Sequence, residues 1–358
     1  MKAVILVGGE GTRLRPLTYD VPKPLLPVAA ISIIERILGH LGGHGVDHAV
    51  LSMGYRPDAF VAAFPENRAA GIRLSYAVEP EPLDTAGAIR FAATESGIDE
   101  TFLVVNGDVL ADLDVGLLVA FHRASGAEGT VALTPVHDPS AFGVVATDDR
   151  GRVEAFIEKP AAGEAPTNLI NAGTYVLEPS VLGRMPEGRP ANVERETFPA
   201  MVAAGTLYGH ASDAYWTDTG TAALYLQANL DCVAGRRGLP PAPGARAAGD
   251  GVWHLGRPVV EGQVAGPTLI ADACFVAGSA VVANSVLGPG CRVEAGARVR
   301  GSVVLPGTSV GPEACVDGSV VGEAAAIHRG AHVSGLAVVG CRAEVPEGAR
   351  VVGGRFPG

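Results

Sequence analysis

The chain begins with the apolar run Ala3-Val4-Ile5-Leu6-Val7 and continues directly into Gly8-Gly9-Glu10-Gly11-Thr12-Arg13. A short aliphatic run that ends in a glycine-rich loop predicts a buried strand followed by a ligand-binding turn. Further strands are predicted at residues 49–52, 72–78 and 102–105, and helices at 33–40, 85–93 and 115–124. Strands that alternate with helices indicate an α/β domain with a mostly parallel sheet, whose functional loops lie at the carboxyl ends of the strands.

The C-terminal part of the sequence carries a repeat. Val264, Ile270, Val276 and Val282 fall six residues apart, and four similar triplets fall 17 residues apart, beginning at Asn284, Gly301, Gly318 and Gly335. One coil of about three hexads per 17 to 18 residues is the pattern of a triangular parallel β-helix with its aliphatic corners stacked inward. A β-sandwich with loose alternation would not keep this register over four turns.

The junction between the two parts has its own composition. A helix predicted at residues 220–232 closes the first part, and residues 235–244 are rich in proline and glycine. Such a composition marks a linker. The sequence therefore predicts an α/β domain at residues 1–234, a linker at 235–258 and a β-helix at 259–358.

Charge and hydropathy exclude some function classes. The chain has 358 residues and a formal net charge of -11. Nucleic acids and anionic membranes both attract clustered Lys and Arg, so this balance argues against either as the principal partner. No apolar run reaches the roughly 18 to 20 residues of a membrane span, and the N-terminus lacks a cleavable signal pattern. We expect a soluble, cytoplasmic protein.

Lysine is rare in this chain. Among 27 Lys and Arg residues, only Lys2, Lys23 and Lys159 are lysines. A lysine that persists against such a bias suggests a need for a compact ammonium, which the planar guanidinium of arginine does not imitate. Lys23 and Lys159 are therefore candidates for functional residues.

The glycine-rich loop predicts a phosphate site. Its glycines let backbone N–H groups surround a chain of phosphates. The loop is not a Walker A motif, because G-K-[ST] is missing, and it is not the dinucleotide fingerprint, because Leu14 stands in place of the third glycine. Arg13 and Lys23 add two cations that can neutralise a triphosphate, although Arg13 could instead be a solvated surface residue.

Residues 8–18 and 22–27 resemble the signature of the sugar-phosphate nucleotidylyltransferases, with mannose-1-phosphate guanylyltransferases as the most similar branch. Further matching motifs follow in family order: Asn106-Gly107-Asp108, Phe142-Gly143-Val144-Val145, Ile157-Glu158-Lys159-Pro160, Asn171-Ala172-Gly173-Thr174-Tyr175, Val193-Glu194-Arg195-Glu196-Thr197-Phe198-Pro199 and Tyr215-Trp216-Thr217-Asp218-Thr219-Gly220. The resemblance implies a Rossmann-like nucleotidyltransferase domain followed by a left-handed β-helix of hexapeptide repeats. It also implies an enzyme that transfers a nucleoside monophosphate to a sugar 1-phosphate and releases pyrophosphate.

The resemblance implies a catalytic set. Asp108 and Asp218 would bind Mg²⁺, which offsets the repulsion between two anionic substrates. Arg13, Lys23 and Lys159 complete the set. For Asp218 the alternative is an N-cap on the helix that follows it. No nucleophilic side chain is needed, because the sugar phosphate is itself the nucleophile.

Two binding sites are implied in the same way. The nucleotide site consists of Leu6, Gly8, Gly9, Gly11, Thr12, Arg13, Glu79, Pro82, Asp84, Thr85 and Gly107. The sugar-phosphate site consists of Gly143, Glu158, Lys159, Asn171 and Gly173, with Lys159 on the phosphate and Glu158 on sugar hydroxyls. Guanine presents two adjacent donors that an ionised Glu79 could accept, whereas uracil and thymine place carbonyl oxygens beside a single donor. Glu79 thus favours GTP, unless it is merely exposed.

Two departures from the family pattern leave the substrates open. The family usually has glycine where Asp84 stands, and residues 28–32 lack the usual glycine and proline. UTP or dTTP, or an uncommon sugar or cyclitol phosphate, is therefore an alternative to GTP and mannose 1-phosphate. Two further alternatives are a catalytically silent sugar-nucleotide-binding regulator and a bifunctional enzyme whose β-helix transfers acyl groups with His328 or His332 as base. We expect the β-helix to mediate homo-oligomerisation.

Overall fold

The computed structural model describes residues 1–161 and 163–357. Gly358, the last residue of the predicted β-helix range, lies outside the described residues. The chain forms two compact units: Met1–Gly9 with Ile34–Trp216, and Glu10–Ile33 with the residues from Thr217 onward. The segment that carries Arg13 and Lys23 therefore belongs to the same unit as the β-helix.

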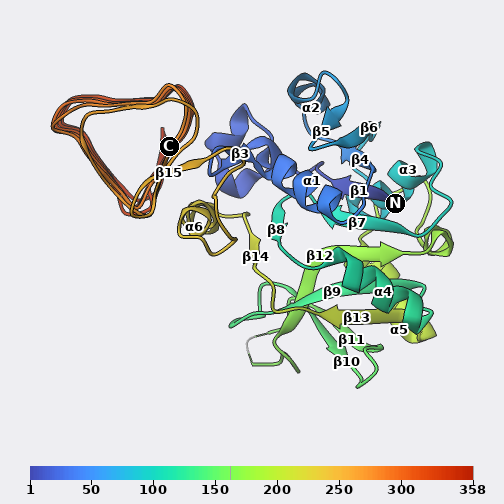
Figure 1. Cartoon of the computed structure of the whole chain (residues 1–358). Helices are drawn as coiled ribbons and strands as arrows, with labels where there is room; N and C mark the ends of the chain where they lie inside the picture. The colour runs from blue at the N-terminus through green and yellow to red at the C-terminus, as the bar shows by residue number, and fades with distance from the viewer. Residues whose placement is uncertain (162, 358) are drawn as a thin grey trace. The chain divides into compact units, whose positions relative to one another are not determined.

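The first unit is built on a mixed β-sheet (Figure 1) with the strand order β11-β10-β12-β7-β1-β4-β6-β5. At its centre, β1 (Lys2–Leu6) pairs in parallel with β4 (His48–Met53) and with β7 (Phe102–Asn106). β4 also pairs in parallel with β6 (Ile72–Val78). These are the four strands predicted from the sequence, and their parallel order confirms the predicted fold class.

The other half of the sheet is antiparallel. β12 (Leu169–Leu177) pairs antiparallel with β7, β9 and β10. The remaining strands of this sheet are β5 (Arg68–Ala69), β9 (Gly129–Pro135), β10 (Gly143–Thr147), β11 (Val153–Glu158) and β13 (Leu207–Ala211). Only residues 148–152 join β10 to β11, which is too short for the crossover that parallel neighbours require.

Helices cover the sheet: α1 (Ile33–Gly43), α2 (Pro57–Ala63), α3 (Asp84–Glu95), α4 (Val115–Ser125) and α5 (Phe198–Ala204). α3 packs on β1, β4 and β6, and α4 packs on β9, β12 and β13. Val4 and Val104 in the sheet and Ile89 in α3 are fully buried, as expected for strands covered on both faces. Among the described residues, no helix combines the length and apolar character needed to cross a membrane.

A tight hairpin in the second unit explains one departure from the family pattern. β2 (Pro27–Val28) pairs antiparallel with β3 (Ile31–Ser32), and the two loop residues, Ala29 and Ala30, have φ values of 45° and 66°. Two positive φ values in a two-residue loop are typical of a type I′ turn, which favours glycine or asparagine because a Cβ is strained there. Asn229 partly offsets the strain, since its Oδ1 accepts the N–H of Ala29 at 2.8 Å.

We expect Ala30→Gly to raise the free energy of unfolding by about 1 kcal/mol, because glycine adopts positive φ without the steric cost of a Cβ. A matched control is Ala200→Gly on the exposed face of α5. Glycine in a helix should lower the stability by about 1 kcal/mol there. Urea unfolding of both variants measures the two signs, and destabilisation by Ala30→Gly would contradict the strain assigned to this turn.

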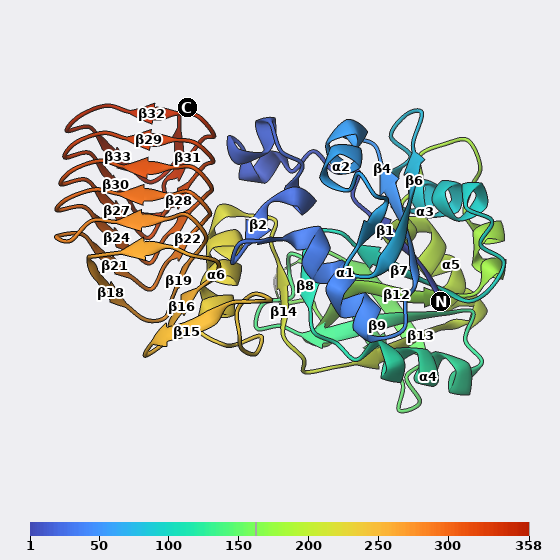
Figure 2. The same ribbon diagram turned by 45° about the horizontal axis from the view of Figure 1, so that its top comes forward.

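The second unit continues into a parallel β-helix, which Figure 1 shows as a triangle along its axis and Figure 2 as a stack of coils. Within residues 252–356 its strands form three parallel sheets. The first contains β16 (Val252–His254), β19 (Thr268–Ile270), β22 (Val286–Leu287), β25 (Val303–Val304), β28 (Val320–Val321), β31 (Val338–Val339) and β34 (Arg355–Phe356). The second contains β17 (Val259–Val260), β20 (Phe275–Val276), β23 (Arg292–Val293), β26 (Ser309–Val310), β29 (Ala326–Ile327) and β32 (Glu344–Val345). The third contains β18 (Gln263–Ala265), β21 (Val281–Ala283), β24 (Arg298–Arg300), β27 (Cys315–Asp317), β30 (His332–Ser334) and β33 (Arg350–Val352).

A buried serine ladder runs up the β-helix. Ser302 donates its N–H to Ser285 Oγ at 3.2 Å, and Ser319 donates its N–H to Ser302 Oγ at 3.1 Å. The three serines are fully buried and stand 17 residues apart. The hydroxyls of Ser285 and Ser302 thus each accept a backbone N–H of the next coil. This confirms the period predicted from the sequence and makes the repeat a hydrogen-bonding requirement as well as a packing one.

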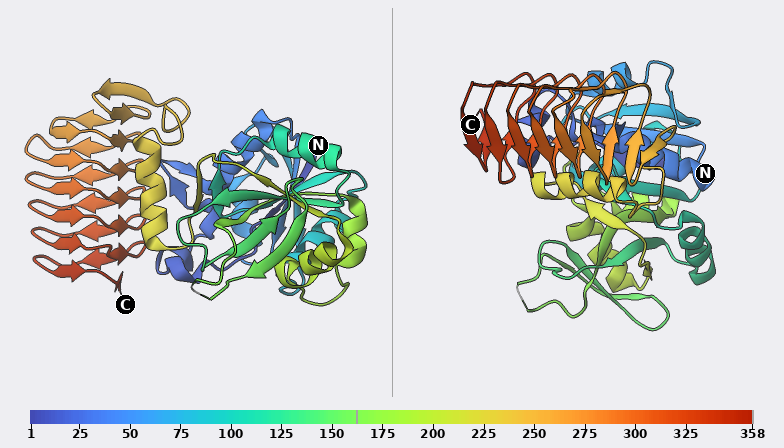
Figure 3. Two further views of the ribbon diagram at one scale, coloured as in Figure 1. Left: turned by 90° about the horizontal axis from the view of Figure 1, so that it is seen from below. Right: turned by 60° about the vertical axis from the view of Figure 1, so that its left-hand side comes forward.

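Part of the range 235–258, predicted as a linker, is regular structure. β15 (Arg246–Gly249) pairs antiparallel with β16, and β16 pairs in parallel with β19 of the β-helix. The β-helix therefore begins before residue 259. The sequence did not predict this first strand because a hairpin holds it and it carries no hexad repeat. α6 (Ala222–Val233) packs against β22 and runs along the coils (Figure 3).

Candidate active site

In the first unit, backbone segments approach closely at the carboxyl end of β1. Gly107 donates its N–H to the carbonyl oxygen of Leu6 at 2.9 Å. A Cβ on Gly107 would lie 2.6 Å from Val7 Cγ1, so the site requires glycine. A Cβ on Gly8 would lie 3.1 Å from the backbone nitrogen of Gly54, whereas a Cβ on Gly9 would have no heavy atom within 4 Å. These residues of the predicted nucleotide site thus form a compact edge where open α/β sheets bind ligands.

Glu79 is anchored through both carboxylate oxygens. The Ser52 hydroxyl donates to Oε1 at 3.2 Å, and the N–H of Leu83 donates to Oε2 at 3.0 Å. Glu79 is partly buried, so the alternative of an exposed surface residue is wrong. The carboxylate holds the loop that contains Pro82, and each oxygen keeps acceptor capacity for a ligand because it has two lone-pair sites.

Asp84 shows why this position usually holds glycine. It begins α3 with a φ of 54°, in the left-handed region, which aspartate tolerates better than most side chains. Its Oδ1 accepts the N–H of Thr85 at 2.6 Å and the Asn192 amide at 3.1 Å. Thr85 Oγ1 in turn accepts the N–H of Val193 at 2.9 Å. The carboxylate is therefore engaged in local contacts that offset the backbone strain.

Glu158 and Lys159 lie at the end of β11, where Glu158 pairs with Gly143 of β10. A Cβ on Gly143 would lie 3.0 Å from Glu158 Oε2, so the glycine makes room for this carboxylate. Lys159 has a φ of 51°, which turns the chain out of the strand. Its Nζ lies 3.4 Å from Glu158 Oε1, with the lysine side chain 60% exposed and the glutamate 17%. A solvent-accessible ammonium beside a shielded carboxylate suits a phosphorylated sugar.

Asn171 organises the same region. Its Oδ1 accepts the N–H of Gly173 at 2.9 Å, and its amide donates to Tyr175 Oη at 2.9 Å and to Glu194 Oε1 at 2.7 Å. Gly173 has a φ of 73°, and a Cβ there would lie 2.7 Å from Asn106 Nδ2. Both amide hydrogens of Asn171 are donated to protein groups, so Asn171 could bind the sugar directly only by accepting a hydrogen bond at the second lone pair of Oδ1.

Glu194 is the residue that the sequence analysis missed. It lies in the π-helical turn η5 (Val193–Thr197), where Asn192 accepts its N–H. Burial, followed by the charge of Glu158, raises the pKa of Glu194 to about 6. A carboxyl that titrates near neutrality beside a second carboxylate is typical of functional sites. Its motif matched the family pattern, but no sequence spacing connects it with Glu158 or Asn171.

In the second unit, Lys23 and Asp218 lie side by side. Lys23 Nζ is 3.4 Å from Asp218 Oδ1, and Arg13 Nη2 is 3.9 Å from Asp218 Oδ2. The Lys23 side chain is 6% exposed and the Arg13 side chain 65%. Both distances exceed the about 2.8 Å of a strong charge-assisted hydrogen bond, so the contacts are loose. Gly11, with a φ of 62°, lets Lys23 approach, and Thr12 begins the short turn η1 (Thr12–Leu14).

Asp218 ends β14 (Trp216–Asp218) and does not cap α6. The N-cap is Thr221, whose hydroxyl accepts the N–H of Leu224 at 3.3 Å. Asp218 Oδ1 instead accepts the N–H of Gly220 at 2.7 Å. The capping alternative is therefore wrong, and this hydrogen bond fixes the carboxylate in the turn before the helix.

Asp108 stands between β7 and β8 (Val109–Ala111) and is partly buried. The negative charge of Asp108 acts on Tyr175 of β12: burial raises the pKa of this tyrosine most, followed by the charges of Glu194, Glu158 and Asp108. Among the described residues, no group of three or more His, Cys, Asp or Glu side chains could hold a metal ion. Mg²⁺ commonly binds through one or two carboxylates together with substrate phosphates, so the predicted pair of Asp108 and Asp218 is of the right chemistry.

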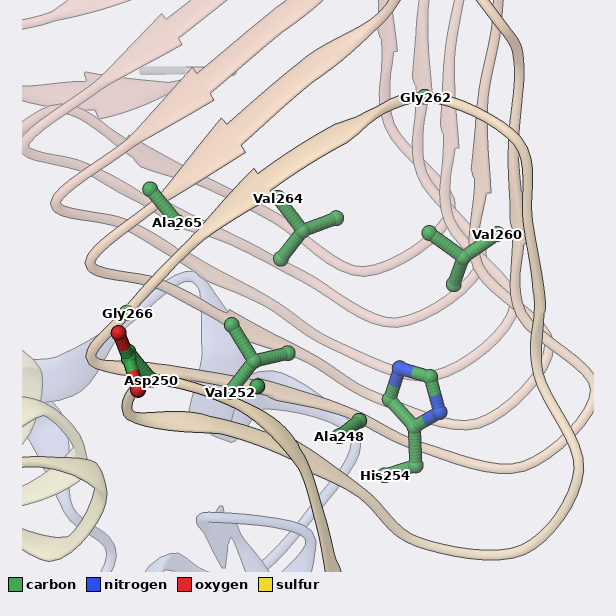
Figure 4. A pocket seen from close by; sticks show the side chains of 10 residues that line it. Ala248, Asp250, Val252, His254, Val260, Gly262, Val264, Ala265 and Gly266 are labelled. Carbon is green, nitrogen blue, oxygen red and sulfur yellow. The ribbon is translucent and has the colours of Figure 1, made fainter.

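A cavity of about 650 Å³ lies in the first coil of the β-helix. Figure 4 shows Val252, Val260 and Val264 around it, together with His254. Burial lowers the pKa of His254, which disfavours its cationic form. Its described lining residues include no lysine or arginine, so this open end of the coil does not suit an anionic substrate.

The chain matches the Nucleotidyl transferase family over residues 2–234 and the GMPPB C-terminal domain over residues 264–355. The sheet with its glycine-rich edge thus identifies the protein class: the chain belongs to the nucleotidyl transferase family. The resemblance seen in the sequence motifs is confirmed.

The relatives narrow the class further. The chain is 40% identical to mannose-1-phosphate guanylyltransferase of Mycobacterium tuberculosis, over 80% of this chain and 76% of that protein. It is 43% identical to mannose-1-phosphate guanyltransferase of Aspergillus fumigatus, over 62% of this chain and 61% of that protein. Among solved structures, HddC from Yersinia pseudotuberculosis aligns with a TM-score of 0.56 at 27% identity, over 64% of this chain and 97% of that chain. HddC was also solved in complex with GMP-PN, with a TM-score of 0.55, 27% identity and the same coverage.

Proposed function

We propose that this chain transfers GMP from GTP to mannose 1-phosphate, forming GDP-mannose and pyrophosphate. The observation that carries the proposal is the pair of Lys23 and Asp218, a rare and nearly buried lysine at 3.4 Å from a carboxylate in the unit of the glycine-rich segment. The names of the relatives and the GMP-PN complex of HddC support the choice of substrates.

The residues divide the work by charge. Arg13 and Lys23 bind the triphosphate, and Lys159 binds the phosphate of the sugar. A phosphate oxygen of the sugar attacks the α-phosphorus, the bond between the α- and β-phosphates breaks, and pyrophosphate leaves. Mg²⁺ bound by Asp108 and Asp218 would neutralise charge on the phosphates. The protein contributes positioning and electrostatic stabilisation.

The alternatives of other classes have less support. A silent regulator would be expected to lack a carboxylate or a cation of the set, and all five residues are present. In the β-helix, His328 Nε2 lies 3.5 Å from Glu344 Oε2 and its side chain is 48% exposed. An exposed pair of this kind supports a surface role for His328 better than that of an acyl-transfer base.

A pyrophosphate-release screen tests the proposed function. It crosses GTP, UTP, dTTP, ATP and CTP with a panel of sugar and cyclitol 1-phosphates, with Mg²⁺ present and then removed by chelation. We expect GTP with mannose 1-phosphate to give the highest kcat/KM, and the activity to require the metal. A higher kcat/KM with another pair would replace the substrate assignment, and no turnover with any pair would support the regulator.

Glu79→Gln is expected to lower the ratio of kcat/KM for GTP to that for UTP by about tenfold, because the variant loses one acceptor for the guanine donors. Loosening of the loop would affect both nucleotides equally, so the ratio isolates base recognition. The control is Glu81→Gln, an exposed glutamate in the same loop. An unchanged ratio in Glu79→Gln would mean that the base is recognised elsewhere.

Two further assignments belong to the proposal. The five cysteines are free thiols, which suits the reducing cytoplasm. The valine side chains that line the open first coil, Val252, Val260 and Val264, offer apolar surface for self-association. Light scattering of the full chain measures the oligomeric state, and a monomer at micromolar concentration would contradict the second assignment.

A further inference from the structure

The segment that carries Arg13 is held by the last coils of the β-helix. Arg355 in β34 donates from Nη2 to the carbonyl oxygen of Arg13 at 3.2 Å. Arg342, just after β31, donates from Nη2 to Asp20 Oδ2 at 2.5 Å. β31 and β34 are neighbouring strands of one sheet, so one guanidinium group comes from a strand of this face of the β-helix and the other from the turn that follows the neighbouring strand.

Close packing accompanies these polar contacts. Gly340 and Pro16 are both buried, and a Cβ on Gly340 would lie 3.1 Å from Pro16 Cγ. Gly340 is itself fixed, because its N–H donates to the carbonyl oxygen of Phe356 at 2.7 Å. The loop therefore rests on the backbone of the coil without room for a side chain between them.

The loop has little regular structure of its own to fix Arg13. It consists of the short turns η1, η2 (Leu17–Tyr19) and η3 (Lys23–Leu25), whose backbone hydrogen bonds reach back only three residues, as from the N–H of Leu14 to the carbonyl oxygen of Gly11 at 2.9 Å. Carbonyl groups at the end of such a turn lack helical partners and need external donors. Arg355 supplies one at the residue whose side chain lies 3.9 Å from Asp218.

We infer that the terminal coil of the β-helix positions Arg13 for the triphosphate. Arg355 is a positioning residue, and Gly340 determines how closely the loop at Pro16 packs on the coil. The inference rests on the proposed function. It gives the β-helix a part in nucleotide binding in addition to any role in assembly. The Arg342–Asp20 pair contributes less, because both side chains are largely exposed.

The test uses the full chain with Arg355→Ala, Arg355→Lys and Gly340→Val. Loss of a hydrogen bond from a charged donor should raise the KM for GTP about five- to tenfold in Arg355→Ala. Lysine keeps a charged donor and should restore much of the affinity. The valine should displace the loop and raise the KM for GTP at least as much. The KM for mannose 1-phosphate and the Tm should change little in the arginine variants.

Arg350→Ala is the matched control, since it removes the same charge from β33, on another face of the same coil. A change in the KM for GTP that occurs in Arg355→Ala but not in Arg350→Ala comes from the lost hydrogen bond and not from a weaker long-range attraction of the triphosphate. An unchanged KM for GTP in both Arg355→Ala and Gly340→Val would overturn the inference, as would equal losses for both substrates with a fall in Tm. Activity of the wild-type chain with GTP tests the proposed function separately from the variants. A wild-type chain that does not use GTP would contradict the proposed function.

Discussion

Asp218→Asn is expected to lower kcat by about a hundredfold or more and to raise the Mg²⁺ concentration needed for half-maximal activity. The amide keeps an oxygen that can accept the N–H of Gly220, so the turn before α6 is preserved. It loses the negative charge that stands 3.4 Å from Lys23 Nζ and that the metal would require. Steady-state kinetics with a Mg²⁺ titration measure both effects.

The control for this variant is Asp213→Asn, which changes an exposed aspartate in the same stretch of chain. It should leave kcat and the Mg²⁺ requirement unchanged. Since Asp218 does not cap the helix, a loss of activity in Asp218→Asn cannot come from fraying of α6. Wild-type kcat at the wild-type Mg²⁺ requirement would remove Asp218 from the catalytic set.

Local features of this fold could be predicted because they repeat or are fully buried. β4, predicted at residues 49–52, was found within one residue of its observed bounds at each end, since a strand buried on both faces reads as a nearly continuous apolar run. The serines at 285, 302 and 319 stand in equivalent places in successive coils, so the sequence displays the period directly. β16 escaped prediction because one strand held by a hairpin has no period to display.

Backbone strain was visible in the sequence only as a missing residue type. The absence of glycine at position 84 and in the turn after Pro27 was apparent, but the reason for it was not. The structure supplies the reason, because Asp84, Ala29 and Ala30 all have positive φ. The glycines usual in the family thus meet a conformational requirement, and their replacement here does not by itself argue for a different substrate.

Non-local electrostatics could not be predicted. The raised pKa of Glu194, in the turn η5, depends on burial and on Glu158, which lies at the end of β11 and 36 positions earlier in the sequence. Likewise, Asn171 looked like a direct sugar ligand, whereas its amide is committed to Tyr175 and Glu194. These groups come together only when β11 and β12 pack with the turn η5.

Glu194→Gln is expected to stabilise the protein at pH 8 while lowering kcat/KM for the sugar phosphate about tenfold. The pKa of Glu194 is raised from 4.5 to about 6. Between these values the folded state binds more protons than the unfolded state, so stability falls as the pH rises and the full cost is present above pH 6. Glutamine stays neutral and can still accept from Asn171. It should therefore gain about 1–2 kcal/mol at pH 8 and almost nothing at pH 4.5.

The pH profile of kcat/KM separates a functional carboxylate from a structural one. The phosphate of the sugar also ionises near pH 6, so the wild type should lose activity on the acid side through two ionisations and Glu194→Gln through one. Glu196→Gln is the control, because Arg189 lowers the pKa of Glu196 and removes it from this range. Identical acid limbs in wild type and Glu194→Gln, together with full activity, would make Glu194 a residue of the fold alone. A shallower acid limb in Glu194→Gln than in the wild type would show that the ionised Glu194 carboxylate, which destabilises the fold, also contributes to activity with the sugar phosphate.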